Sequence, residues 1–176
     1  MSETLRLFIG LDATALARPL QLLQQGWGAI GKPVAAENFH LTVHFLGSVD
    51  AGCLPALQQL IGQCQQQHAW HSSSLRLDQA GAFPRARVAW IGPSQLPMPL
   101  QQLEQDLRQA LTAAGWTLEP RPFRPHISLF RALARDWTAP TAITPLSLTL
   151  DTLHLYESRS SPHGVRYLPL ASWSLL

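Results

Sequence analysis

The stretch that decides the fold is FHLTVHFLG, at residues 39–47. Apolar, β-prone side chains alternate there with His40, Thr42 and His44. Alternation with a period of two predicts a strand with one buried face, because successive side chains point to opposite sides. We therefore expect His40 and Thr42 to project together from the other face. His44 belongs to that face too, either at the edge of a cleft or simply exposed to solvent.

The same pattern returns near the C-terminus as FRPHISLFR, at residues 123–131. His126 and Ser128 share one face of this predicted strand, and apolar side chains share the opposite face. The two histidines are 86 positions apart. One tetrapeptide of this kind arises easily by chance. Two copies, each in a predicted strand, are much stronger evidence that the two motifs serve one function.

The composition fits a folded cytoplasmic protein. Of the 176 residues, 46% are hydrophobic, which supports a real core. No apolar run reaches the roughly 18 residues of a membrane span. Residues Met1 to Thr4 lack the basic and apolar segments of a signal peptide. If Cys53 and Cys64 share one helix, they lie about 16 Å apart along it, too far for a disulfide, so we expect free thiols in a reducing compartment.

The charge is nearly balanced, at +2, but Lys32 is the sole lysine among 13 basic residues. Arginine suits bidentate contacts to phosphate and stacking on bases. A GC-rich genome produces the same bias, so it is weak support for nucleic-acid binding.

Periodicity divides the chain into alternating strands and helices. The predicted strands cover 5–11, 39–47, 75–78, 88–91, 126–131, 146–151, 153–156 and 165–170. The predicted helices begin near Arg18, at 54 and near 100, and loops cover 32–38, 81–87 and 135–145. A strand, a helix and a histidine strand follow one another twice in this order. The segment SLRLD at 74–78 is also echoed by SLTLD at 147–151.

We interpret this repetition as an internal duplication, with halves of about 1–86 and 87–176 in a single bilobal domain, 1–176. If a pseudo-twofold axis relates the lobes, the histidine strands face each other across a cleft. One neutral imidazole can then take a proton while the other, protonated, gives one. The Thr42 and Ser128 hydroxyls can donate to the non-bridging oxygens of a phosphate. An in-line displacement at phosphorus needs this arrangement, and it needs no metal.

Rival chemistries fit the sequence poorly. His40 and His44 would bind zinc on a helix, but on a strand they lie ~13 Å apart. No carboxylate or cysteine cluster completes a metal site. The Gly-x-Ser-x-Gly elbow of serine hydrolases and a phosphate-binding glycine loop are both absent from the sequence.

The doublet HLTV at 40–43 and HISL at 126–129 resembles the HxTx signature of the 2H phosphoesterases. Further segments narrow the resemblance to the bacterial RNA 2′,3′-cyclic phosphodiesterases, also called 2′-5′ RNA ligases. These segments are RLFIGLD (6–12), NFHLT (38–42), FLG (45–47), PFRPH (122–126) and YES (156–158). The resemblance spans nearly the whole chain, although Ser128 replaces the commoner threonine.

The resemblance implies an α+β, bilobal, pseudo-twofold fold, with two antiparallel sheets flanking a central cleft and helices outside. It implies RNA processing by a hydrolase that opens a 2′,3′-cyclic phosphate to a 2′-phosphate without metal or cofactor. Some members also join tRNA halves reversibly through a 2′-5′ linkage. The expected partner is RNA or a nucleotide with such an end, and we expect a monomer with no membrane association.

The resemblance and the motifs together give a set of candidate site residues. His40 is assigned as proton donor and His126 as proton acceptor. The candidate substrate contacts are Thr42, Ser128, Arg131, Phe8 and Arg124. A regular strand would turn Arg131 away from the site unless the strand ends or bulges there. Phe8 is either a base-stacking ring or a core residue, and Arg124 can attract the RNA backbone.

Two alternatives remain open. The chain could be a binding module that holds RNA ends without turnover, or a 2H phosphodiesterase for another small nucleotide, such as a 2′-5′ oligoadenylate or a cyclic ADP-ribose phosphate. Intact histidine motifs in both lobes favour the enzyme, because binding alone needs no matched pair of acid–base groups.

Overall fold

The computed structural model describes residues 3–176, so Met1 and Ser2, on which the expectation about a signal peptide partly rests, lie outside it. Its strands are β1 (Thr4–Asp12), β2 (Lys32–Pro33), β3 (His40–Asp50), β4 (Ser73–Leu77), β5 (Gln79–Phe83), β6 (Val88–Gly92), β7 (Ile127–Arg131), β8 (Leu146–Leu150), β9 (Thr152–Ser161) and β10 (Gly164–Ser174). Its helices are α1 (Ala17–Trp27), α2 (Leu54–His68) and α3 (Met98–Ala113), with 3-10 turns η1 (Thr14–Leu16), η2 (Ala36–Asn38) and η3 (Ala51–Cys53).

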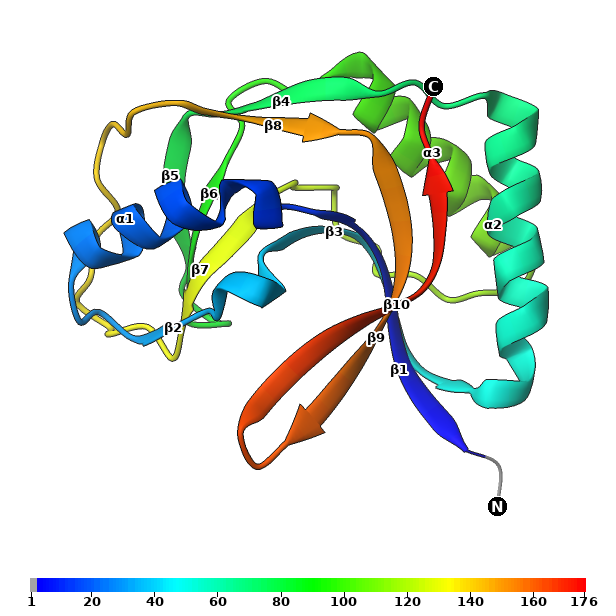
Figure 1. Ribbon diagram of the computed structural model, residues 1–176, viewed down its shortest axis with the longest axis horizontal. Coiled ribbons are helices and arrows are strands. Elements are labelled where there is room, and N and C mark those ends of the chain that lie inside the picture. Colours follow the sequence, from blue (N-terminus) through cyan, green and yellow to red (C-terminus); the bar gives the residue numbers. More distant parts are fainter. Residues whose placement is uncertain (1–2) are drawn as a thin grey trace.

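Two antiparallel sheets organise these elements. In the larger sheet the strand order is β10-β9-β1-β3-β7-β6-β5, and β2 pairs with β7. Strands β4 and β8 form the second sheet. Figure 1 shows α1 on one side of the molecule, where it packs on β7, and α2 and α3 together on the other side, against β10 and β3. The predicted α+β fold, with two antiparallel sheets and outer helices, is confirmed.

The two histidine strands meet in the middle of the large sheet. Strand β3 comes from the first half of the chain and β7 from the second, and they pair at Leu41 and Ile127. Both side chains are fully buried, in one core cluster that draws residues from both halves. The motifs are therefore held together by backbone pairing and by a shared core.

The helices follow the predicted apolar stripes. In α3 the side chains of Leu100, Leu103, Leu107 and Leu111 are all buried. The chain leaves this helix through Gly115, whose φ of 90° is easily reached by glycine, as the sequence predicts for a helix end. In the described part of the chain, no helix combines the length and the apolar character that crossing a bilayer requires.

One predicted loop is wrong in its first part. Residues 81–87 were expected to form a turn or loop, and 84–87 do form a turn, but Gln79–Phe83 is strand β5, paired with β6. The segment QAGAF carries no β-branched residue, so its own propensity is weak and pairing with β6 stabilises it. Gly81 makes room for the neighbouring strand, because a Cβ there would collide with the Trp90 ring. The expected loop at 32–38 likewise contains β2 and η2.

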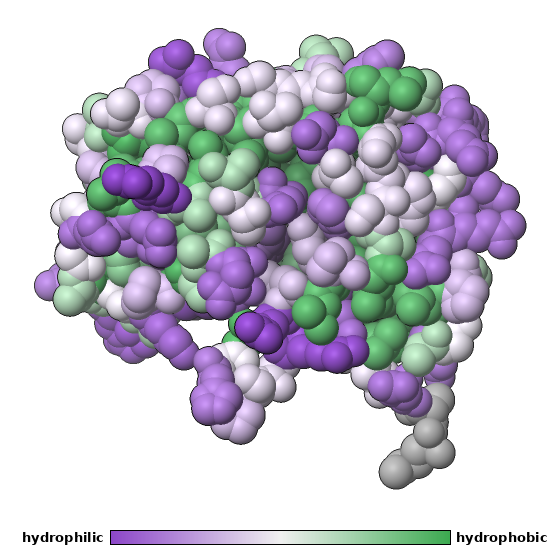
Figure 2. Space-filling view, viewed as in Figure 1, coloured by the Kyte–Doolittle hydropathy of each residue, from purple (hydrophilic) through white to green (hydrophobic). Residues whose placement is uncertain are grey.

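The echoed segments at 74–78 and 147–151 lie side by side. They form β4 and β8, with Leu75 opposite Leu148, and the hydroxyls of Ser74 and Ser147 are 2.7 Å apart. A hairpin of β9 and β10 stands out from the body below them, as Figures 1 and 2 show. The internal duplication and its division into halves stay our interpretation.

Candidate active site

The four motif residues lie on one face of the β3–β7 pair. Because this pairing is antiparallel and centred on Leu41 and Ile127, extending it by one residue sets His40 toward Ser128 and Thr42 toward His126. Leu41 and Ile127 are fully buried, so their neighbours project from the other side. All four motif residues are partly exposed. The structure therefore brings both histidines and both hydroxyls together.

A bulge in β3 reverses its alternation just after the motif. Thr42 pairs with Gly10 and His44 with Ile9, which leaves Val43 as the extra residue. Val43 and His44 are both buried, and Phe45 returns to the face of His40, where the residue is 43% exposed. The expectation that His44 shares a face with His40 is therefore wrong.

A bulge at the matching place in β7 brings Arg131 toward the candidate site, whereas the bulge in β3 turns His44 away from it. Ser128 pairs with Trp90 and Phe130 with Ala89, so Leu129 is the extra residue. Leu129 and Phe130 are both buried, and Arg131 comes to the exposed face that carries Ser128. The positive charge of Arg131 contributes to lowering the pKa of both histidines, so it lies within electrostatic reach of each.

The two imidazoles are oriented in the same way. His40 Nδ1 lies 2.7 Å from the carbonyl oxygen of Asn38, and His126 Nδ1 lies 2.7 Å from that of Arg124. A carbonyl oxygen can only accept, so Nδ1 carries the proton in both rings and the neutral form leaves Nε2 without one. The Thr42 hydroxyl then donates to Nε2 of His40 over 2.9 Å.

Each histidine also packs against the edge of an aromatic ring from a neighbouring strand. Tyr167 of β10 meets His40 at 4.7 Å between ring centroids and 75° between planes. Phe83 of β5 meets His126 at 4.9 Å and 81°. Sequence reasoning missed both rings, since neither lies near a motif in the chain, and β5 had been predicted as a loop.

The structure places two further candidate substrate contacts, Phe8 and Arg124. Phe8 is 1% exposed and lies 4.9 Å from the His40 ring, stacked on Tyr156. Of the two alternatives given for Phe8, the structure therefore supports a core residue and not a ring that stacks on a base. The Arg124 side chain is exposed, as expected for an RNA contact, but it is the backbone carbonyl of this residue that orients His126.

Burial sets the protonation of both histidines. It lowers the pKa of His40 to about 4, aided by the charges of Arg131 and His126 and opposed by the Asn38 carbonyl and the Asp12 carboxylate. Burial and Arg131 also lower the pKa of His126, against the Arg124 carbonyl. Both rings are thus neutral at pH 7 in the free protein. An anion bound between them would favour protonation of either.

A cavity of about 140 Å³ adjoins His40 on the side of Asp12, Asn38, His154 and the rings of Tyr156 and Tyr167. Its other lining residues are Thr14, Glu37, Phe39 and Pro169. Within residues 3–176, no three His, Cys, Asp or Glu side chains come close enough to hold a metal ion.

Comparison with known proteins gives consistent results. Residues 15–162 match the model of the 2′-5′ RNA ligase superfamily. The RNA 2′,3′-cyclic phosphodiesterase of Escherichia coli (strain K12) is 38% identical over 181 aligned residues, which cover 99% of each chain. The enzyme of the same name from Thermotoga maritima is 28% identical and covers 93% of this chain and 91% of its own. A crystal structure of E. coli LigT complexed with 3′-AMP has a TM-score of 0.88 at 35% identity, over 98% of this chain and 99% of that chain.

Proposed function

Because the chain belongs to the 2′-5′ RNA ligase superfamily, we propose that it hydrolyses 2′,3′-cyclic phosphate ends of RNA to 2′-phosphates. One observation carries the proposal: on paired strands, His40 and His126 each fix Nδ1 on a backbone carbonyl and keep Nε2 for proton transfer. One Nε2 can accept a proton while the other, once protonated, donates one.

The reaction follows from this geometry. Nε2 of His126 takes a proton from a water molecule, and the water oxygen attacks phosphorus. The bond from phosphorus to the 3′ oxygen breaks on the opposite side, and the departing oxygen receives a proton from Nε2 of His40. The product is a 2′-phosphomonoester with a free 3′ hydroxyl. Solvent then returns a proton to His40 and removes one from His126.

Thr42 acquires a second role when His40 is protonated. In the neutral ring Nε2 accepts from the Thr42 hydroxyl. The protonated ring has only donors, so that hydrogen bond must reverse or break. The Thr42 hydrogen then becomes available to a non-bridging oxygen of the phosphate. Binding of substrate to the hydroxyl and protonation of His40 therefore favour each other.

Negative charge on the phosphate is held from the β7 side. The Ser128 hydroxyl lies on the motif face, and Arg131 reaches that face through the bulge at Leu129. A guanidinium and two hydroxyls directed at the non-bridging oxygens stabilise the charge that increases in the transition state.

A terminal base stacks on Phe45 in this proposal, in place of Phe8. Phe45 occupies in β3 the position that Arg131 occupies in β7, three residues after the motif hydroxyl and beyond a bulge. Its ring is exposed and Arg6 lies 5.6 Å from its centre. Phe8 also stacks on it, at 5.8 Å between ring centroids. A partly exposed aromatic ring next to a cation suits a nucleobase.

Several finer features belong to the same proposal. If the 5′ hydroxyl of a second RNA replaces water, the same two histidines catalyse a reversible 2′-5′ ligation.

Cys53 is exposed and Cys64 buried, both as free thiols, which supports a reducing, cytoplasmic setting. We assign the chain as a monomer, because both histidine strands come from one chain.

A turnover assay tests the proposal. RNA oligomers and mononucleotides with a 2′,3′-cyclic phosphate are incubated with the protein, and phosphorus NMR identifies the product. We expect a 2′-phosphate from wild type and from His71→Ala, a variant of an exposed histidine, and a large loss for His40→Ala and His126→Ala. RNA binding without turnover in wild type would instead support a binding module, and turnover of unrelated cyclic nucleotides only would indicate another substrate.

A further inference from the structure

The two histidines differ in one cross-strand neighbour. In the β1–β3 register Leu11 pairs with Leu41, and Asp12 pairs with His40. In the β6–β7 register Ile91 pairs with Ile127. Continuing that register by one residue sets Gly92 opposite His126. At matching positions of the two lobes, one histidine therefore faces a carboxylate and the other a glycine.

Gly92 has no room for a side chain. A Cβ at this position would lie 2.8 Å from the carbonyl oxygen of Pro125 and 3.2 Å from the Trp90 ring. The backbone before His126 thus closes the place that a carboxylate would need. This difference between the lobes is built into the packing.

The Asp12 carboxylate is held in position at the cavity beside His40. It accepts hydrogen bonds from the backbone N–H of Thr14 over 2.7 Å and from the Thr14 hydroxyl over 3.0 Å. Asp12 and His40 both line this cavity. Cβ atoms of directly paired residues lie about 5 Å apart, a distance at which unit charges interact appreciably even near a surface.

We propose that Asp12 is a positioning residue that favours the protonated form of His40, and so supports His40 in the role of proton donor. This inference rests on the proposed function. It gives a physical cause for unequal roles in two motifs that are otherwise alike. Burial of His40 favours its neutral form, so a donor at this place requires a nearby negative charge to be protonated.

The other charged groups around His40 do not stabilise its protonated form as Asp12 does. Arg131 from β7 acts on both histidines in the same direction, and the charge of His126 also lowers the pKa of His40. Glu37 of η2, His154 and Tyr156 of β9 and Tyr167 of β10 also line the cavity. Among the carboxylates, Asp12 alone contributes to raising the pKa of His40, and it acts in the same direction on the pKa of His154 and Tyr156. Within residues 3–176, no carboxylate contributes to the pKa of His126.

Asp12→Asn tests the inference, because the amide oxygen keeps an acceptor for Thr14 while the charge is lost. Histidine side-chain NMR titrations should show a lower pKa for His40 and an unchanged one for His126. In the pH profile of kcat/KM, rates on the alkaline side should fall, because less of His40 is protonated there. Activity at pH 8 should fall about fivefold, as expected for one partly screened charge.

Two further variants complete the experiment. Asp12→Glu keeps the charge and should restore the wild-type titration of His40. Glu37→Gln removes another carboxylate of the same cavity and should leave it unchanged. An unaltered His40 titration in Asp12→Asn, an equal change at His126, or the same shift in Glu37→Gln would overturn the inference. The NMR titration needs no turnover, so this failure is distinct from failure of the proposed function, which His40→Ala and His126→Ala decide.

Discussion

Thr42 and His44 are two positions apart in β3, yet they lie on opposite sides of the sheet. The extra residue between them, Val43, inverts the alternation, so Thr42 faces the candidate site and His44 packs into the core with 4% exposure. His44 Nε2 donates to the backbone oxygen of Glu104 over 3.2 Å and lies 3.5 Å from its carboxylate. The strand that carries the first motif is thereby fastened to α3.

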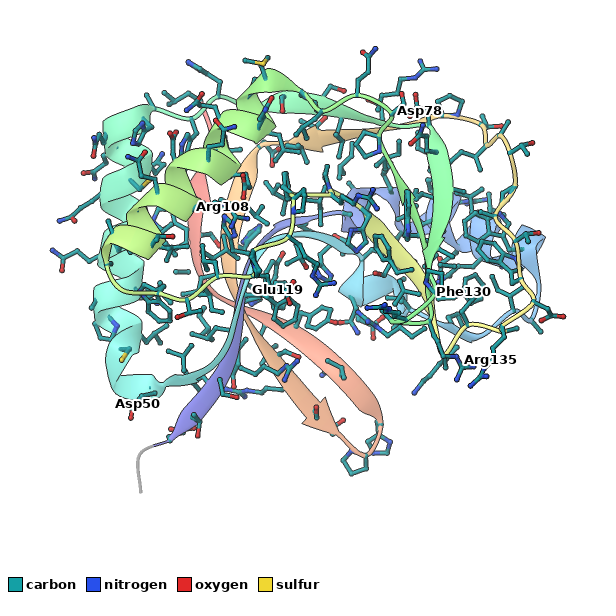
Figure 3. The ribbon with its side chains drawn as sticks, turned by 180° about the vertical axis from the view of Figure 1, so that it is seen from behind. Asp50, Asp78, Arg108, Glu119, Phe130 and Arg135 are labelled. Atoms are coloured by element: carbon teal, nitrogen blue, oxygen red, sulfur yellow. The ribbon has the colours of Figure 1, made fainter. Side chains whose placement is uncertain are left out.

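Replacing His44 should reduce stability. His44→Leu removes a buried hydrogen bond to the Glu104 carbonyl, which should lower the free energy of unfolding by about 0.5–1.5 kcal/mol. Arg108, labelled with Glu119 in Figure 3, still donates to the Glu104 carboxylate over 2.8 Å and to the Glu119 carbonyl oxygen over 3.1 Å. Denaturant unfolding measures the change, and the exposed His71→Leu is the control. Equal stabilities of the two variants would contradict the anchoring role.

Loss of either catalytic histidine should cost on the order of 10²- to 10⁴-fold in kcat. Because both act in one transition state, the double variant should be far less damaging than the product of the two single effects. A substrate with an activated 3′ leaving group should rescue His40→Ala but not His126→Ala. Rescue of His126→Ala instead would exchange the roles, and normal kcat in both variants would remove them from the mechanism.

Removal of metal should leave the activity intact. Proton transfer is assigned to two imidazoles, and phosphate charge to two hydroxyls and Arg131. Cyclic phosphodiesterase rates are measured before and after prolonged EDTA treatment and dialysis, with and without added Mg²⁺ or Zn²⁺. A loss on chelation that a divalent ion restores would show that the two-histidine mechanism is incomplete.

Phe45→Ala should weaken binding of the terminal nucleotide. A base stacked on an aromatic side chain is worth about 1–3 kcal/mol, so KM should rise roughly tenfold with kcat little changed. A ribose cyclic phosphate without a base should show no such difference between wild type and variant. Leu22→Ala removes an apolar side chain that is 58% exposed on α1 and serves as the control. An equal KM increase for the base-free substrate would argue against stacking.

Acid should destabilise the protein partly through His40. Burial lowers its pKa in the folded state to about 4, below the ordinary value of 6.5, so the unfolded chain takes up the proton first. The stabilising contribution is complete above pH 6.5 and is lost as the pH falls toward 4. His40→Gln should therefore lose less stability than wild type between pH 7 and pH 5 in denaturant unfolding. His71→Gln should behave as wild type, and an identical loss in all three proteins would contradict burial of a neutral His40.

The sequence by itself determined most of the architecture. Period-two alternation located the strands of His40 and His126, and apolar stripes located the helices, as Leu100 to Leu111 in α3 illustrate. Pro55 near the start of α2 and Gly115 after α3 mark helix boundaries through local backbone chemistry. These features depend on near neighbours in the chain, which is why the sequence reports them directly.

Only the tertiary structure decided which side chains beyond the motifs face the site. A bulge adds one residue between paired strands and reverses every later position, and its location depends on the register with a partner strand far away in sequence. The bulges at Val43 and Leu129 turn His44 inward and bring Phe45 and Arg131 outward.

The same reason explains the remaining differences. Phe8 is closed off by rings from β9 and β10, the weak strand β5 exists through its pairing with β6, and Asp12 meets His40 through the register of β1 with β3. Local alternation fixes which residues form a strand. Cross-strand packing, which joins distant segments, fixes which of their side chains reach the substrate.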